Sequence, residues 1–240
     1  MFRSTFYELY VSHFKQGYSA MSESELAIQR EWARHKYLPL LEGLAPDAPV
    51  LEIGCGPGYL LEFLRQSGFT RAEGIDLSQQ QVDLATRRGH KAEAADVFKF
   101  LEGKENRFDA IIAIDLFEHF SKEELMRLAR AIQNALREGG ILLVQTANGQ
   151  GLFAPRIIHS DFTHMTMLTP GSMEQLLTLF SFSSFRFVES GPAPIGMRGK
   201  ARVLAWGLIK AGLNLMLKIE CGQSHDIWTS NMICACRKRS

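Results

Sequence analysis

Val50-Leu51-Glu52-Ile53-Gly54-Cys55-Gly56-Pro57-Gly58-Tyr59 is the stretch that decides the fold, because an apolar strand runs directly into three alternating glycines. Glycines lack Cβ atoms, so they let the chain turn sharply from a strand into a helix. They also let a ligand lie against main-chain N–H groups at the helix N-terminus. The stretch therefore predicts a cradle for a nucleotide-type ligand.

The spacing of these glycines disfavours a dinucleotide. The G-x-G-x-x-G fingerprint requires its third glycine at position 59, where this chain has Tyr59. The third glycine instead comes one residue early, at Gly58, and the acidic Glu52 precedes the first glycine by two residues. A tight structural turn that binds no ligand is the alternative.

The composition is that of an ordinary globular protein. The chain has 240 residues, 46% hydrophobic and 22% charged, which is enough for one full core with a small elaboration. The net charge of +1 shows no overall signature of nucleic-acid binding, so no nucleic-acid partner is expected. The charge is uneven, however, because residues 191–240 hold eight basic and two acidic side chains.

The cysteines and the apolar runs indicate the compartment. Four cysteines without a zinc spacing fit a reducing cytoplasm. The N-terminus lacks the apolar core and cleavage site of a signal peptide, and no apolar run reaches the ~18 residues of a membrane span. A cytoplasmic protein is therefore expected.

Strands and helices alternate along the middle of the chain, and this pattern predicts the fold class. The expected architecture is α/β: a Rossmann-like, doubly wound sheet, mostly parallel, with helices on both faces. A capping box at Ser121 and Glu124 begins one helix, which Gly139-Gly140 should close. Parallel strands are expected at 50–53, 71–75, 90–94, 108–114 and 141–146, and an antiparallel final strand pair at 185–189 and 231–236.

Acidic residues follow three of these strands. Asp76-Leu77 follows the second strand, Asp96-Val97 the third, and Asp115 the fourth. The carboxyl ends of parallel strands meet at one edge of a sheet, so these acids should gather beside the glycine turn. A carboxylate such as Asp76 suits the two hydroxyls of a ribose, although it could equally cap the helix that follows.

Residues 45–190 resemble the class I S-adenosylmethionine (SAM) dependent methyltransferases, through segments 52–58, 74–78, 108–114 and 136–140. The resemblance implies SAM as cofactor. It places the methionine moiety on Gly54, Gly56 and Gly58, the ribose on Asp76, and the amino-acid end on Asp115. The remaining residues that it implies for the cofactor are Asp96 and Val97 at the adenine, together with Glu52, Cys55 and Leu77.

A narrower resemblance concerns the acceptor. Segments 156–164 and 168–177 are similar to bacterial methyltransferases of surface-polysaccharide and glycan assembly, although 180–182 reads Phe-Ser-Phe where relatives commonly have Ala-Gly-Phe. The resemblance implies O-methylation of a sugar or glycan hydroxyl. Methylation of a small lipid or quinone-like hydroxyl, and SAM binding without turnover, are the alternatives.

Two histidines compete to be the general base that takes the hydroxyl proton. His164 is favoured, with Asp161 as its orienting carboxylate, and His119 is expected to bind the acceptor or shape the site. A purely structural role is the alternative for each. Residues 115, 118, 119, 161 and 164 offer metal-ligand types without a diagnostic spacing, so no metal is expected.

The predicted organisation is a helical cap at 1–45, the SAM-binding core at 46–190, a basic amphipathic helical insert at 191–229, and the final strand at 230–240. The cap consists of an aromatic-rich stretch, 1–22, that could close over the cofactor, followed by a helix predicted at about 23–41. The insert holds a helix at 203–219. Its apolar face is expected to pack on the sheet or on a second subunit of a homodimer, and peripheral contact of 198–219 with anionic lipid is the alternative.

Overall fold

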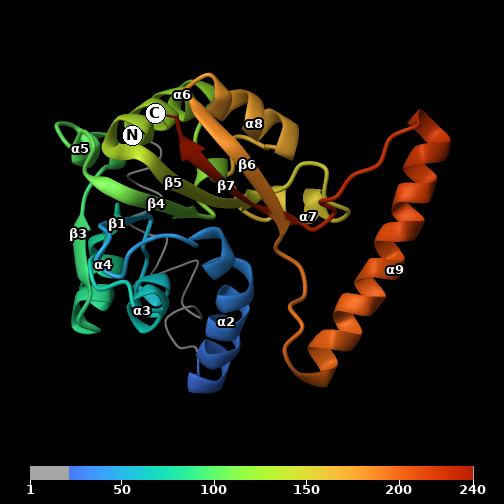
Figure 1. The fold of residues 1–240 in the computed structure, drawn as a ribbon, viewed down its shortest axis with the longest axis horizontal. Helices are drawn as coiled ribbons and strands as arrows, with labels where there is room; N and C mark the ends of the chain where they lie inside the picture. Colours follow the sequence, from blue (N-terminus) through green and yellow to red (C-terminus); the bar gives the residue numbers. More distant parts are fainter. Residues whose placement is uncertain (1–21, 240) are drawn as a thin grey trace.

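The computed structural model describes residues 22–239, and its centre is a seven-stranded sheet in the order β3-β2-β1-β4-β5-β7-β6 (Figure 1). Strands β1 to β5 are parallel, while β7 runs antiparallel to both β5 and β6. This confirms the predicted Rossmann-like sheet with its antiparallel final pair. The strands are β1 Val50–Ile53, β2 Ala72–Asp76, β3 Lys91–Ala94, β4 Phe108–Ile114, β5 Leu136–Ala147, β6 Phe182–Glu189 and β7 Asn231–Lys238.

Helices cover both faces of the sheet, and each face has its own apolar core. One core is formed with α5, α6 and α8, and the other with α2 and α3. The helices are α2 Glu23–Lys36, η3 Leu38–Leu40, α3 Tyr59–Gln66, α4 Gln79–Arg87, α5 Val97–Leu101, η4 Phe117–His119, α6 Lys122–Ala135, α7 Ala154–Ile158, α8 Pro170–Thr178 and α9 Gly196–Cys221.

Helix α6 begins as predicted and ends early. Ser121 and Glu124 form the expected capping box, but the helix ends at Ala135 rather than at the glycine pair 139–140. Leu136 is extended (ψ 142°), pairs with Phe108 of β4 and is fully buried. Burial of this leucine in the sheet outweighs continuation of the helix.

The N-terminal helix is also shorter than predicted. The sequence favours a helix from 23 to 41, whereas α2 ends at Lys36 and a 3-10 turn follows. Leu38 precedes Pro39, and a residue before proline disfavours the α conformation, so the helix ends just ahead of it. The predicted aromatic flap at 1–22 lies, except for its last residue, outside the described residues.

Helix α9 differs most from expectation. It spans 26 residues, Gly196–Cys221, has no buried residue, and stands apart from the sheet in Figure 1. Leu204, Leu208 and Leu215 are exposed, so the predicted packing of its apolar face on the sheet is wrong. Among residues 22–239, no helix is long and apolar enough to cross a bilayer.

Candidate active site

A cavity of about 860 Å³ opens at the carboxyl ends of the parallel strands. Its lining includes the glycine turn after β1, the tip of β2, and the start of the segment after β4. Helix α2 contributes a further wall. The lining includes the side chains or backbone of Tyr37, Glu52, Gly54, Gly56, Asp76, Asp115, His119 and Gln145.

Glycine is needed at the three positions of the turn for different physical reasons. All have positive φ, at 76° for Gly54, 51° for Gly56 and 83° for Gly58. A Cβ on Gly58 would lie 2.7 Å from His90, and one on Gly54 would lie 3.2 Å from Leu116. A Cβ on Gly56 would meet no protein atom within 4 Å. Gly54 and Gly58 therefore allow close packing, while Gly56 keeps open the space beside the cavity.

Asp76 holds the glycine turn in place. Its Oδ2 accepts a hydrogen bond from the Gly56 N–H (2.9 Å), and its Oδ1 accepts one from the Ser78 N–H (2.8 Å). The N-cap of α4 is Ser78, so the alternative of Asp76 as that cap is wrong. A carboxylate has about four acceptor positions, which leaves capacity for hydroxyl donors of a ligand.

Glu52 is a buried acid at the base of the cavity. Its Oε2 has no hydrogen-bond partner among the described residues. Burial, and then the negative charge of Asp76, raise the pKa of Glu52 well above its ordinary value. Asp76 and Asp115 line the same cavity, and their carboxylates would attract the cationic part of a ligand bound beside the glycine turn.

We expect Glu52→Gln to raise the melting temperature of the ligand-free protein at about pH 8 and to leave it unchanged at about pH 4. The raised pKa means that the folded state prefers the neutral carboxyl. Below the unfolded pKa of about 4.3 both states are protonated, and above it the unfolded state ionises more readily, so wild-type stability is lost as pH rises. Glutamine stays neutral and escapes this loss, and each kcal/mol gained corresponds to roughly 2–4 °C.

Calorimetric melting across this pH range measures the effect. The exposed Glu42 provides the control variant, Glu42→Gln, which should melt like wild type throughout. If Glu52→Gln melts no higher than wild type at alkaline pH, the buried Glu52 carboxylate does not destabilise the folded state.

Asp115 directly follows β4, and its side chain is hydrogen-bonded to residues of β5 and β7. It has a positive φ of 48°, unusual for a non-glycine residue and typical of functional sites. Its Oδ1 accepts hydrogen bonds from Gln145 Nε2 (3.0 Å) and Asn231 Nδ2 (3.2 Å). The Tyr37 hydroxyl donates to Gln145 Oε1 (2.9 Å). The sequence did not predict Gln145 and Asn231 as partners of Asp115, or Tyr37 as a partner of Gln145, although a glutamine within the apolar strand β5 was a usable signal.

Four predicted cofactor residues, Gly58, Leu77, Asp96 and Val97, lie outside the cavity lining. Asp96 caps α5, because its Oδ1 accepts from the N–H groups of Phe98 (3.0 Å) and Lys99 (3.2 Å). Val97 is buried in the core, and Leu77 is exposed. The Ala95 N–H donates to the Asp76 carbonyl, so this segment follows the strand tip closely. The adenine role of Asp96 and Val97 stays a prediction.

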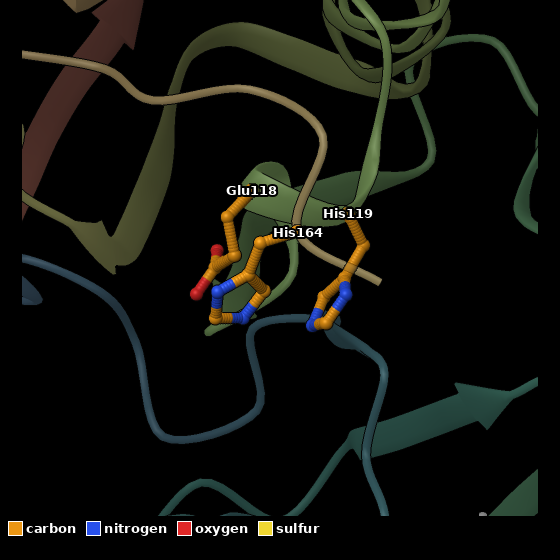
Figure 2. A group of neighbouring side chains, drawn as sticks. All are labelled: Glu118, His119 and His164. Carbon is orange, nitrogen blue, oxygen red and sulfur yellow. The ribbon is translucent and has the colours of Figure 1, made fainter. Parts of the chain in front are cut away.

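A cluster of Glu118, His119 and His164 lies beside the cavity (Figure 2). His119 comes from η4 after β4, and His164 from the segment after α7. The two imidazole centroids are 4.8 Å apart with 60° between the rings. Residues distant in the sequence thus meet at the predicted sheet edge.

Asp161 orients His119 rather than His164. The Thr163 hydroxyl donates to Asp161 Oδ1 (2.6 Å) and lies 2.8 Å from His119 Nδ1. Because that hydroxyl proton goes to the carboxylate, Nδ1 of His119 is assigned as the donor and Nε2 as the unprotonated nitrogen of the neutral ring. His164 Nδ1 instead lies 3.3 Å from the Ile158 carbonyl oxygen. The predicted pairing of Asp161 with His164 is therefore not what the side chains show.

Glu118 is a titratable residue of this cluster that was not predicted as a site residue. It is buried, and its Oε2 accepts a hydrogen bond from the Thr146 hydroxyl (2.7 Å). Burial, and then the charge of Asp115, raise the pKa of Glu118 to about 7. One donor atom from each of Glu118, His119 and His164 lies within 4.8 Å of the others, so this set could hold a divalent cation.

The comparisons with known proteins now identify the family. The methyltransferase domain profile matches residues 26–186. The chain belongs to this methyltransferase family. A solved SAM-dependent methyltransferase from Archaeoglobus fulgidus has the same fold, with a TM-score of 0.66, 16% identity, and coverage of 89% of this chain and 94% of that one. SAM is therefore the cofactor, and the cavity fits it: the Asp76 and Asp115 carboxylates suit a cation, and Gly56 leaves the cradle open.

Two curated relatives show the range of the family. A probable fatty acid methyltransferase of Pseudomonas putida is 25% identical over 156 residues, covering 57% of this chain and 40% of that protein. The ubiquinone biosynthesis O-methyltransferase of Neisseria meningitidis serogroup C is 26% identical over 106 residues, covering 41% of this chain and 44% of that protein. The matches span less than half the length of either relative.

Proposed function

We propose that this methyltransferase transfers the methyl group of SAM to a hydroxyl of a sugar or glycan. The observation that carries the proposal is an oriented histidine, His119, in the wall of the cavity beside the glycine turn. Bound SAM supplies a methyl group already activated on a sulfonium. The protein must then hold the donor, place the hydroxyl and remove its proton.

Gly54, Gly56 and Gly58 hold the methionine moiety in this proposal. The Asp76 carboxylate accepts from the ribose hydroxyls while it keeps the Gly56 amide in place. Asp115 contacts the amino-acid end, held by Gln145 and Asn231. Asp96, Val97, Leu77 and Cys55 complete the predicted contacts. The negative charges of Asp76 and Asp115 favour a cationic donor over its neutral demethylated product, which helps product release.

His119 removes the hydroxyl proton in this proposal. The sequence favoured His164, but the Asp161–Thr163 pair holds His119 in a defined tautomer, and His119 lines the cavity. A neutral imidazole positioned in this way contributes about 10² to 10⁴ in rate. His164 lies against the His119 ring and helps to position the acceptor.

The acceptor proposal rests on the likeness of 156–177 to glycan-assembly methyltransferases. A small lipid or quinone-like hydroxyl is the second candidate, favoured by the match to a ubiquinone biosynthesis O-methyltransferase. Mass spectrometry of a panel of cell-envelope glycans, quinone precursors and lipids incubated with SAM distinguishes the two. Methylation of a quinone precursor alone would overturn the glycan proposal.

Calorimetric titration with SAM and with NAD checks the cofactor, and the methylation assay above separates methyl transfer from SAM binding without turnover. We expect SAM to bind and NAD not to bind. SAM binding with no methylated product on any acceptor class would favour a sensor or assembly subunit. The cytoplasmic location stays a prediction.

We expect methyl transfer to continue unchanged in EDTA after metal-free purification, because proton removal by His119 requires no Lewis acid. The cluster of Glu118, His119 and His164 makes this measurement decisive. Initial rates would be compared with and without chelator, and then with added Mg²⁺, Mn²⁺ or Zn²⁺. Activity that disappears in EDTA and returns with one of these ions would assign the two imidazoles to a metal instead.

A further inference from the structure

The exposed face of α9 carries a continuous apolar stripe, here called the outer stripe. Its members recur at intervals of seven and four residues, so they lie on one side of a helix with about 3.6 residues per turn. Each is at least 61% exposed. The outer stripe consists of Met197, Leu204, Leu208, Leu215 and Ile219.

The opposite face of α9 is tied to the body of the protein by polar contacts. Trp206 Nε1 and Lys210 Nζ both donate to Glu189 Oε2, at 3.0 and 3.1 Å. Asn214 Nδ2 donates to the His225 carbonyl, and Asn214 Oδ1 accepts from Trp228 Nε1 (3.0 Å). These hydrogen bonds fix the rotation of α9 about its axis. The outer stripe, on the opposite side of the helix, therefore faces away from the body of the protein.

The first turns of α9 are strongly basic. Arg198, Lys200 and Arg202 follow the helix start at Gly196, where the helix dipole disfavours positive charge. No ion pair joins them to an acid within residues 22–239. Over its whole length α9 has five basic residues and one acid, Glu220. An anionic surface would offset this unbalanced charge.

A second copy of the chain fits the stripe poorly. Lys200 and Lys218 are 18 residues apart, about five full turns, so they flank the stripe on the same side. Antiparallel pairing of two α9 helices would bring Lys200 of one copy near Lys218 of the other. Parallel pairing would instead place the two basic N-terminal turns together. Both arrangements bring like charges into contact.

We propose that α9 lies flat on an anionic lipid surface, with the outer stripe at the boundary between headgroups and acyl chains. The helix is about 39 Å long, and its flanking lysines can extend toward the headgroup phosphates while their stems cover apolar surface. An interfacial helix requires apolar residues facing the acyl chains and cations near the headgroup phosphates. Its rotation must also be held, and here the hydrogen bonds of Glu189 and Asn214 hold it. This proposal is independent of the proposed acceptor.

Sedimentation with vesicles tests the proposal on the full chain. Wild type should pellet with phosphatidylglycerol/phosphatidylcholine vesicles at low salt and stay in the supernatant with phosphatidylcholine alone. Arg198→Gln/Lys200→Gln/Arg202→Gln should bind the anionic vesicles about 100-fold more weakly, since each lysine or arginine near the surface contributes about 1 kcal/mol. Leu204→Gln/Leu208→Gln should bind at least tenfold more weakly, because it removes two exposed leucines that the lipid would bury.

Met126→Gln/Leu179→Gln is the matched control, because it removes two exposed apolar side chains that lie elsewhere, on α6 and just after α8. It should bind like wild type. SAM affinity, measured in each variant without vesicles, should not change, which separates this proposal from the methyl-transfer proposal. Wild type left in the supernatant, or a dimer that depends on the stripe in sedimentation velocity without lipid binding, would overturn the lipid assignment.

Discussion

Replacing His119 with alanine should lower kcat for methyl transfer by about 10² to 10⁴, while the Kd for SAM changes little. His119 lines the cavity, and its Nδ1 is held by Thr163, which is held in turn by Asp161. Loss of the imidazole removes the group that accepts the hydroxyl proton. Single-turnover rates with saturating SAM measure the chemical step apart from binding.

Two further variants keep this test sharp, since His119 is buried and alanine could destabilise the fold. Thr163→Val keeps the His119 imidazole but removes the hydroxyl that orients it. We therefore expect kcat to fall and its pH dependence to shift, with KM little changed. His159→Ala, at an exposed histidine in the same segment, should behave like wild type. A His119→Ala protein that folds, binds SAM and keeps its kcat would refute the role of His119 as general base. A large loss of kcat in His164→Ala alone would instead favour His164, as the sequence predicted.

Replacing Gly56 with alanine should weaken SAM binding by about 10- to 100-fold, from overpacking worth about 1–3 kcal/mol. Gly56 lines the cavity and its added Cβ meets no protein atom within 4 Å, so the proposed position of SAM is the space that this Cβ would enter. Positive φ also adds a folding cost of about 1–2 kcal/mol for an L-residue. Calorimetric titration with SAM measures the affinity, and thermal melting measures the stability.

Gly43 offers the matched control for this variant. It also has positive φ, at 90°, with no atom within 4 Å of its virtual Cβ, and it does not line the cavity. Gly43→Ala should therefore lower the melting temperature to a similar extent and leave SAM affinity intact. Equal SAM affinities in the two variants would show that Gly56 does not face the cofactor.

The two tests address different halves of the reaction. The glycine variant reports on how the donor is held, and the histidine variant reports on how the acceptor is activated. Loss of donor binding with an intact base, or the reverse, would therefore identify which half of the proposal fails. Neither depends on whether α9 meets lipid.

The sequence by itself determined the sheet, the position of the cofactor turn and the family. Alternating apolar strands and amphipathic helices are local patterns, and the three glycines at 54, 56 and 58 act within a few residues of one another. The placement of Asp76 and Asp115 at one edge followed as well, because parallel strands end together. All of these features depend on short-range periodicity and on a topology with few alternatives.

Only the tertiary structure decided which side chains act on one another across the site. Asp161 is three residues from His164, yet through Thr163 it orients His119, more than forty residues away. Asp115 is held by Asn231 at a separation of 116 residues. The rotation of α9 was equally hidden, because a helical pattern shows which face is apolar and not which face is bonded to the body. Such pairings depend on how distant segments pack, and no local propensity encodes that.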